Sequence, residues 1–204
     1  MPITEVPLPV ALCLLSWVAV GIGMAVNRMA VNRARGSGPA TRRDPRSLVG
    51  LVIQALGFSL CFGAWRPPAS TPAAMHAILS WLGVALAWGS AWVVIQSVRV
   101  LGREWSLEAR LLPAHRLVQQ GPYRYVRHPI YSGMLGLLVG TGLNVTTWPA
   151  LLLGVALYLV GTVLRTRVEE GLLLERFGEQ YTRYAAEVPA LLPVPFTSGR
   201  RGRA

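Results

Sequence analysis

The sequence predicts an all-α integral membrane protein, a bundle of about five transmembrane helices. Hydrophobic residues fill 52% of the 204 positions and charged residues only 14%, whereas soluble proteins carry about a quarter charged residues. Apolar stretches recur along the chain, and about 20 residues are enough to cross a hydrocarbon core as a helix. All 20 basic residues are Arg, and they gather between the apolar stretches.

Three apolar segments in the first half are each long enough to span a bilayer as a helix. They cover residues 6–26, residues 47–65 and part of 74–101. The first has the position of a signal peptide, but Glu5 precedes it and the arginines follow it. This order of charges favours an anchor that stays in the protein.

Two further apolar segments predict a helical hairpin. They cover residues 130–143 and 147–164 and flank a short polar break at 144–146. The first arm would be about 21 Å long at 1.5 Å per residue, so it is the shortest of the expected spans. The second arm continues out of the membrane as a helix and ends or bends at the Phe177-Gly178 pair.

An amphipathic helix is expected after this hairpin. Phe177, Tyr181, Tyr184 and Val188 recur at spacings of three and four residues, which is typical of one face of a helix. This face could lie on the membrane, but packing against the bundle is favoured. Pro189 ends the helix.

The arginines alternate between the connecting segments. Six lie in residues 27–46, one in the second connection, six in 96–129, none in the hairpin break and seven from residue 165 onward. Because Arg-rich short loops stay on the cytoplasmic side, five spans satisfy this pattern if the N-terminus lies outside. We therefore expect a protein of the inner or plasma membrane whose C-terminus and active-site segments are cytoplasmic.

We expect one membrane domain over residues 1–204. Residues 1–101 form its three-span part, 102–193 its catalytic and cofactor-binding part, and 194–204 a disordered basic tail. The net charge of +11 would suit a nucleic-acid partner, but the spans interrupt the arginines, so no continuous basic face and no nucleic acid are expected.

Small residues and cysteines have structural roles in this interpretation. Glycines recur at helix-packing spacings and predict close helix contacts, namely at the pairs Gly50 and Gly57, Gly136 and Gly140, and Gly154 and Gly161. Cys13 and Cys61 lie in apolar segments without a CxxC spacing, so they indicate buried thiols and no metal site.

The stretch HRLVQQGPYRYVRHPIYSG, residues 115–133, is the first with a chemical signal. Gly121 and Pro122 indicate a turn, and Pro129 suits the first turn of the fourth helix. Arg127 and His128 then lie at a helix amino end. Unpaired N–H groups beside a guanidinium form a receptor for a carboxylate.

A pair of carboxylates provides the second signal. Glu169 and Glu170 lie just beyond the apolar part of the last span. They could simply pair with Arg165 or Arg167. Alternatively, one of them faces inward, towards the Arg-His pair at the other arm of the hairpin, and meets a cationic ligand. Both arms end at the same membrane face, so the two signals belong to one site.

These two segments together resemble a known family. The pattern HxLVxxGxYxxxRHPxYxG, a helical hairpin and then EExxLxxxFGxxYxxYxxxVP is similar to the isoprenylcysteine carboxyl methyltransferases and, more loosely, to the integral-membrane phospholipid methyltransferases. The similarity covers residues 115–193. The first three spans match only in hydropathy.

The resemblance implies S-adenosylmethionine as cofactor, bound without a Rossmann fold between the C-terminal helices and capped by the tail. The cofactor-binding residues that it implies are His115, Val118, Gly121, Tyr123, His128, Pro129, Tyr131, Glu169 and Glu170. It implies Arg127, His128 and Glu170 as catalytic residues, with Arg127 holding the acceptor. The acceptor that the resemblance implies is the carboxylate of a prenylated cysteine or another lipidic or small apolar molecule.

A carboxylate acceptor fits these residues, because it is ionised at pH 7 and needs a cation but no general base for direct displacement. An amine of a phospholipid or a small thiol would instead need His128 or a Glu as base. Two other classes stay open. A sterol-reductase-like enzyme would need a nicotinamide pocket, and a non-catalytic membrane module would tolerate replacement of the Arg and both Glu.

Overall fold

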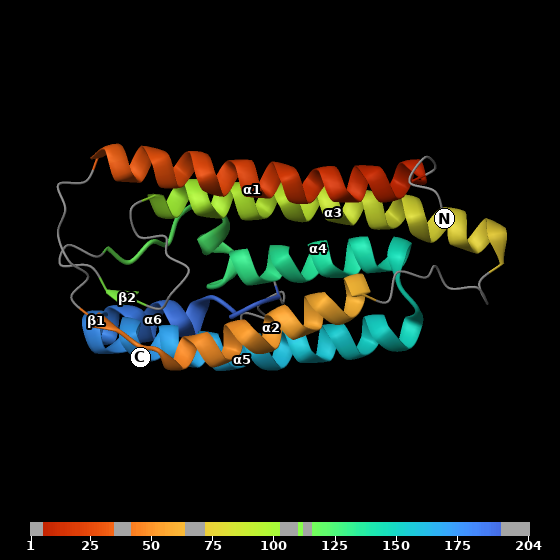
Figure 1. Cartoon of the computed structure of the whole chain (residues 1–204). Coiled ribbons are helices and arrows are strands. Elements are labelled where there is room, and N and C mark those ends of the chain that lie inside the picture. The colour runs from red at the N-terminus through yellow and green to blue at the C-terminus, as the bar shows by residue number, and fades with distance from the viewer. Residues whose placement is uncertain (1–5, 35–41, 64–71, 103–109, 112–115, 193–204) are drawn as a thin grey trace, which may run out of the picture.

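The computed structural model describes residues 6–34, 42–63, 72–102, 110–111 and 116–192. In this part of the chain, five long helices run alternately up and down an elongated bundle (Figure 1), namely α1 (Leu8–Ala34), α2 (Arg46–Gly63), α3 (Ala73–Leu101), α4 (Pro129–Val145) and α5 (Trp148–Phe177). The 3-10 helix η2 (Gly121–Arg124) precedes α4 and the short helix α6 (Glu179–Glu187) follows α5. Both lie at the same end of the bundle (Figure 1).

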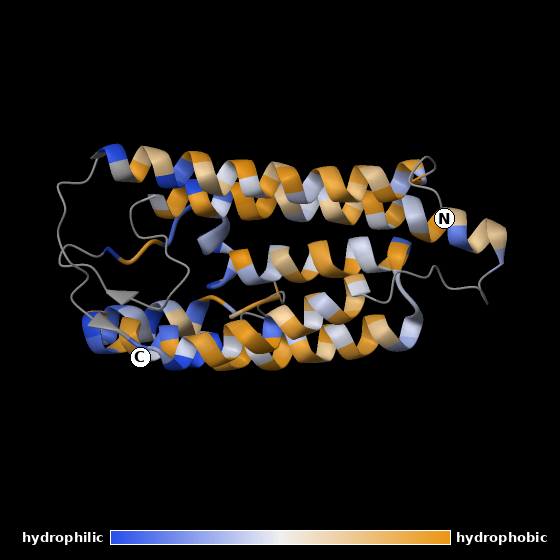
Figure 2. Ribbon diagram, viewed as in Figure 1, coloured by the Kyte–Doolittle hydropathy of each residue, from blue (hydrophilic) through white to orange (hydrophobic). Residues whose placement is uncertain are grey.

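The predicted bundle of apolar helices is confirmed, but two helices are longer than predicted. Helix α1 continues to Ala34, past the predicted span 6–26, and α4 is longer than the predicted 130–143. Helices α1, α2, α3 and α5 are long and apolar enough to cross a membrane, and α4 is a shorter apolar helix of 17 residues. At 1.5 Å per residue α4 is about 26 Å long, slightly less than a hydrocarbon core. Hydrophobic residues follow the length of the bundle, and hydrophilic ones gather at the end with α6 (Figure 2).

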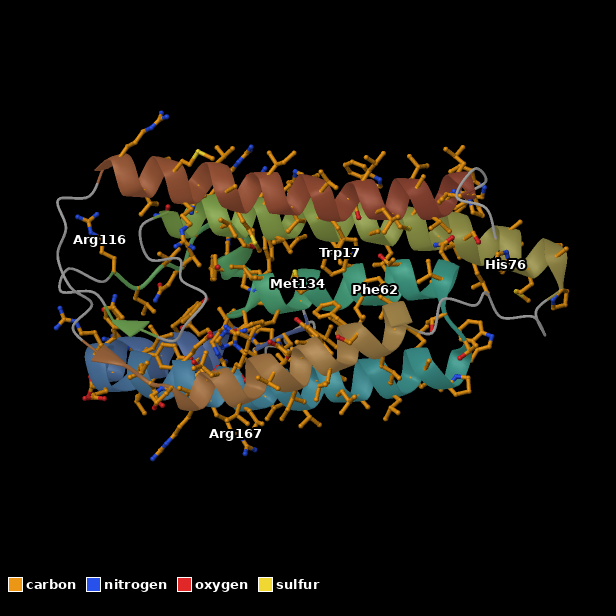
Figure 3. All side chains as sticks on the ribbon, viewed as in Figure 1. Trp17, Phe62, His76, Arg116, Met134 and Arg167 are labelled. Carbon is orange, nitrogen blue, oxygen red and sulfur yellow. The ribbon has the colours of Figure 1, made fainter. Side chains whose placement is uncertain are left out.

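Helix α4 lies between two helix groups and joins them. α1 and α3 pack on one side of it, whereas α2 runs along α5 on the other. Leu137 is fully buried in the cluster with α1 and α3, and its neighbour Leu138 in the cluster with α2 and α5. Trp17 and Phe62 meet edge-to-face across the groups, with ring centroids 5.7 Å apart (Figure 3).

Glycines bring α2 and α5 into close contact, as their spacing predicts. A Cβ added to Gly161 would lie 2.5 Å from the Gly50 carbonyl oxygen, and one added to Gly57 would lie 2.6 Å from the Gly154 oxygen. Both distances are far below van der Waals contact, so only glycine permits this approach. On the opposite side of the bundle Gly140 faces Gly83 in the same way.

Two expected helix boundaries agree with the structure. Pro129 is the first residue of α4, and α5 ends at Phe177, just before Gly178, whose φ of +50° favours glycine. One feature has no signal in the sequence. Strands β1 (Arg42–Arg43) and β2 (Arg110–Leu111) form a two-residue antiparallel ladder at the end of the bundle that carries α6. Residues 35–41 of the first arginine-rich segment, and all of the predicted basic tail, residues 194–204, lie outside the described residues.

Candidate active site

Residues 189–191, which follow α6, fold back over the start of α4. The backbone N–H groups of Arg127 and His128 donate to the carbonyl oxygens of Pro189 and Ala190, at 2.8 and 2.9 Å. The Ser132 hydroxyl donates to the carbonyl of Leu191. These bonds hold Arg127 and His128 beside the outer part of α5, where both glutamates lie. The expectation that the two hairpin arms form one site is therefore met in the geometry.

Arg127 is bound on two sides. Its Nε and Nη2 donate to Glu170 Oε1 at 3.0 and 2.8 Å, and its Nη1 donates to the carbonyl oxygens of Ala185 and Val188 at 2.9 and 2.6 Å. Four of the five guanidinium N–H groups are thereby engaged. Arg127 thus links α5 to the end of α6, and one Nη2 hydrogen takes no part in these four bonds.

His128 lies between the two carboxylates. Its Nε2 is 3.0 Å from Glu170 Oε1, and its Nδ1 is 3.6 Å from Glu169 Oε2. The imidazole side chain is 6% exposed, so both contacts are shielded from water. Glu170 Oε1 accepts all the bonds that Arg127 and His128 make to this carboxylate, so its second oxygen takes no part in them. That oxygen could accept from a ligand.

Glu169 belongs to a separate set of contacts. The Tyr131 hydroxyl donates to Glu169 Oε1, and Arg165 Nη2 lies 3.9 Å from the same oxygen. The Arg165 guanidinium stacks over the Tyr131 ring at 5.2 Å, a cation–π distance. Arg165 is 6% exposed, whereas Arg167 is exposed and points away from the bundle (Figure 3). Of the two arginines considered as simple partners of the glutamates, only Arg165 contacts one in the described residues.

Two tyrosines of α6 close the site, so the favoured prediction that this helix packs on the bundle is confirmed. The Tyr184 hydroxyl donates to the Tyr123 carbonyl at 2.7 Å, and burial raises the pKa of Tyr184 to about 12. Burial and the charge of Glu170 raise the pKa of Tyr181. The Tyr181 hydroxyl is buried and has no hydrogen-bond partner among the described residues, although Glu170 and Arg127 are close enough to affect its pKa.

The other cofactor-binding residues expected from the sequence, where the structure describes them, lie in or near η2 and at the start of α4. Tyr123 is buried, and burial together with the nearby charge of Glu169 raises its pKa. Gly121 begins η2 with a φ of +59°, and Pro129 is buried at the start of α4, so both shape the backbone. Val118 is half-buried before η2, and its role stays a prediction. His115 lies outside the described residues.

Sequence reasoning missed Gln54, Arg165 and Tyr181 as parts of this site. Gln54 is a buried amide in an otherwise apolar span, and it accepts a hydrogen bond from Arg165 Nη1 at 3.1 Å. A lone polar residue within a membrane span is itself a signal, because its burial in lipid is costly. The sequence placed Tyr181 only on the apolar face of the amphipathic helix and did not indicate a role in the site.

The sequence matches a known family of methyltransferases. Residues 72–180, more than half of the chain, match the family described as phospholipid methyltransferase. The chain belongs to this family.

Two curated relatives carry the name of an isoprenylcysteine enzyme, in line with the resemblance of the motifs. Protein-S-isoprenylcysteine O-methyltransferase B of Arabidopsis thaliana is 38% identical over 81 residues, which are 39% of this chain and 40% of that protein. Protein-S-isoprenylcysteine O-methyltransferase of Schizosaccharomyces pombe is 34% identical over 80 residues, 39% of this chain and 34% of that protein. The matches thus span well under half of each relative.

Proposed function

We propose that this protein is a membrane methyltransferase that uses S-adenosylmethionine and methylates the carboxylate of a lipidic acceptor resembling an isoprenylcysteine. The convergence of Arg127, His128, Glu169 and Glu170 from both ends of one helical hairpin carries this proposal. Family membership and the names of both relatives support it.

The residues of the site suit this cofactor. S-adenosylmethionine supplies a methyl group already activated on a sulfonium. The buried Tyr181 hydroxyl has no hydrogen-bond partner among the described residues, and the second oxygen of Glu170 takes no part in the bonds to Arg127 and His128. Both atoms can bind the polar groups of such a molecule. The carboxylates of Glu169 and Glu170, whose side chains are 25% and 28% exposed, can face the cationic part of such a molecule.

Arg127 is the proposed contact for the acceptor. Its remaining Nη2 hydrogen can donate to a carboxylate, while Glu170 and the tail carbonyls fix the guanidinium. In the proposed reaction an acceptor oxygen forms a bond to the methyl carbon as the carbon–sulfur bond breaks, and no proton moves. The site then needs mainly to align the acceptor and exclude water. Residues 189–191 fold back over Arg127 and His128 and can help to exclude water there.

A phospholipid amine is the second candidate acceptor, and the description of the matched family favours it. An ammonium must lose a proton before it attacks, so His128 or Glu169 would then serve as base.

Methyl transfer by the full chain in detergent separates these candidates. The protein is incubated with S-adenosylmethionine carrying a labelled methyl group and either a farnesylated cysteine or phosphatidylethanolamine. We expect label in the first acceptor, as an ester that mild base releases, and its loss in Glu170→Gln. The matched control is Glu179→Gln on the exposed face of α6. Base-stable label in phosphatidylethanolamine would favour the second candidate, and absence of cofactor binding by calorimetry would refute both.

We also propose that the N-terminus lies outside and that the end with η2 and α6 faces the cytoplasm. The arginine-rich segments adjoin that end of the bundle, and short cytoplasmic loops are rich in Arg.

A further inference from the structure

Helix α2 extends the charged cluster into the bundle through a chain of buried polar groups. Arg165 Nη1 donates to Gln54 Oε1 at 3.1 Å, and Gln54 Nε2 donates to Thr162 Oγ1 at 2.8 Å. The exposed fractions of Gln54, Thr162 and Arg165 are 4%, 0% and 6%. These groups therefore lie in the interior of the contact between α2 and α5.

The shape of α2 makes room for the arginine. A Cβ added to Gly50 would lie 2.6 Å from Arg165 Cγ, so any larger residue there would collide with the arginine side chain. Gln54 follows Gly50 by one helical turn and therefore meets the guanidinium on the same helix face. α2 thus both accommodates the stem of Arg165 and provides an acceptor for its head.

Helix packing alone does not require this arginine. A guanidinium in a membrane span is costly, and apolar residues of similar volume pack α2 against α5 at less cost. Its contacts point instead towards the site, because Nη2 faces Glu169 at 3.9 Å and the guanidinium covers the Tyr131 ring at 5.2 Å. Tyr131 in turn donates its hydroxyl to the same Glu169 oxygen.

We infer that Gln54 and Arg165 are positioning residues that hold Glu169 and Tyr131 in the orientation needed to bind S-adenosylmethionine. This inference rests on the proposed function. Gln54 fixes the plane of the guanidinium, and the guanidinium fixes the carboxylate and the phenol together. The orientation of Glu169 then depends on α2, although α2 itself brings no charged group to the site in the described residues.

The test is calorimetric binding of S-adenosylmethionine to the full chain in detergent, together with the Tm of each variant. Gln54→Met keeps the volume of the side chain and removes the acceptor. We expect its Kd to rise about tenfold, as for residues coupled within one hydrogen-bond network. The matched control is Thr141→Val, which removes the buried bond from Trp17 Nε1 at 2.9 Å between α1 and α4, away from the site. We expect a similar loss of Tm in the control and an unchanged Kd.

A double-mutant cycle tests whether Gln54 acts through the tyrosine. If it does, Gln54→Met adds little to the rise in Kd caused by Tyr131→Phe, whereas Thr141→Val and Tyr131→Phe stay additive. Should Gln54→Met not fold, Arg165→Lys keeps the charge and removes the planar fork, and the same rise in Kd is expected. An unchanged Kd in the folded variant, or additive effects with Tyr131→Phe, overturns the inference while wild-type binding upholds the proposed function. Loss of binding in the wild type would instead refute the proposed function itself.

Discussion

Arg127 and Glu170 form the central ion pair of the site, with two N–H groups of the guanidinium on one carboxylate oxygen at 3.0 and 2.8 Å. The exposed fractions of the two side chains are 14% and 28%, so water screens the pair only in part. The same guanidinium binds two carbonyls at the end of α6. The Arg127 side chain thus connects the start of α4, the outer part of α5 and the end of α6.

Replacement of Arg127 by lysine tests this connection. Lysine keeps the positive charge but cannot donate to Glu170 and both carbonyls at once. Hydrogen bonds to charged groups contribute about 1.5–3 kcal/mol each, so we expect methyl transfer to fall about 10- to 100-fold. Hydrogen exchange of residues 179–187 should rise in parallel. Arg124→Lys in η2 serves as control. Equal activity of both variants would contradict the need for a guanidinium that binds Glu170 and both carbonyls at once.

Gly161 tests the close contact between α2 and α5. In Gly161→Ala the new methyl group would lie 2.5 Å from the Gly50 carbonyl, so the helices must separate. We expect a loss of about 1–3 kcal/mol in unfolding free energy, as for other overpacked sites. Gly171→Ala in the same helix is the control, because nothing lies within 4 Å of its added methyl group. Thermal unfolding in detergent measures both, and equal Tm values would argue against the contact.

Stability should fall at alkaline pH. Burial raises the pKa of Tyr184 from its ordinary value of 10 to about 12, and the pKa of Tyr181 also rises. A pKa that is higher in the folded state gives stability that is present below pH about 10 and is lost as the pH rises through about 12. We expect Tm to decrease over this range, and to decrease less in Tyr184→Phe. A constant Tm from pH 9 to 11.5 would contradict the burial of these phenols.

The orientation in the membrane can be read with introduced cysteines. Pro149 lies at the hairpin end of the bundle and Glu179 at the end with α6, and both are exposed. We expect a membrane-impermeant thiol reagent to label Pro149→Cys in intact cells and Glu179→Cys only after permeabilisation. Cys13 and Cys61 are buried, so the wild type gives the background. The reverse labelling pattern would overturn the proposed orientation.

The sequence alone determined the apolar helices and most of the charged site. Hydropathy predicts the helices, because a backbone in lipid must satisfy its own hydrogen bonds. Pro129 and Gly178 predict helix ends because each restricts or frees local backbone angles. Arg127, His128, Glu169 and Glu170 could be identified because charges beside apolar segments are rare and follow local patterns.

Tertiary structure decided which of these groups meet. No local pattern relates Gln54 to Arg165, which lie 111 residues apart. Nor does any local pattern show that Arg127 Nη1 donates to carbonyls at the end of α6. Tertiary structure also decides that Glu170 contacts Arg127 while Glu169 contacts Tyr131. Adjacent side chains on a helix point about 100° apart, so the two carboxylates meet different partners. Likewise, hydropathy alone does not determine that α2 pairs with α5 and α3 with α4. Helix pairing in a membrane depends on the fit of small residues across a contact, and that fit exists only once the helices are assembled.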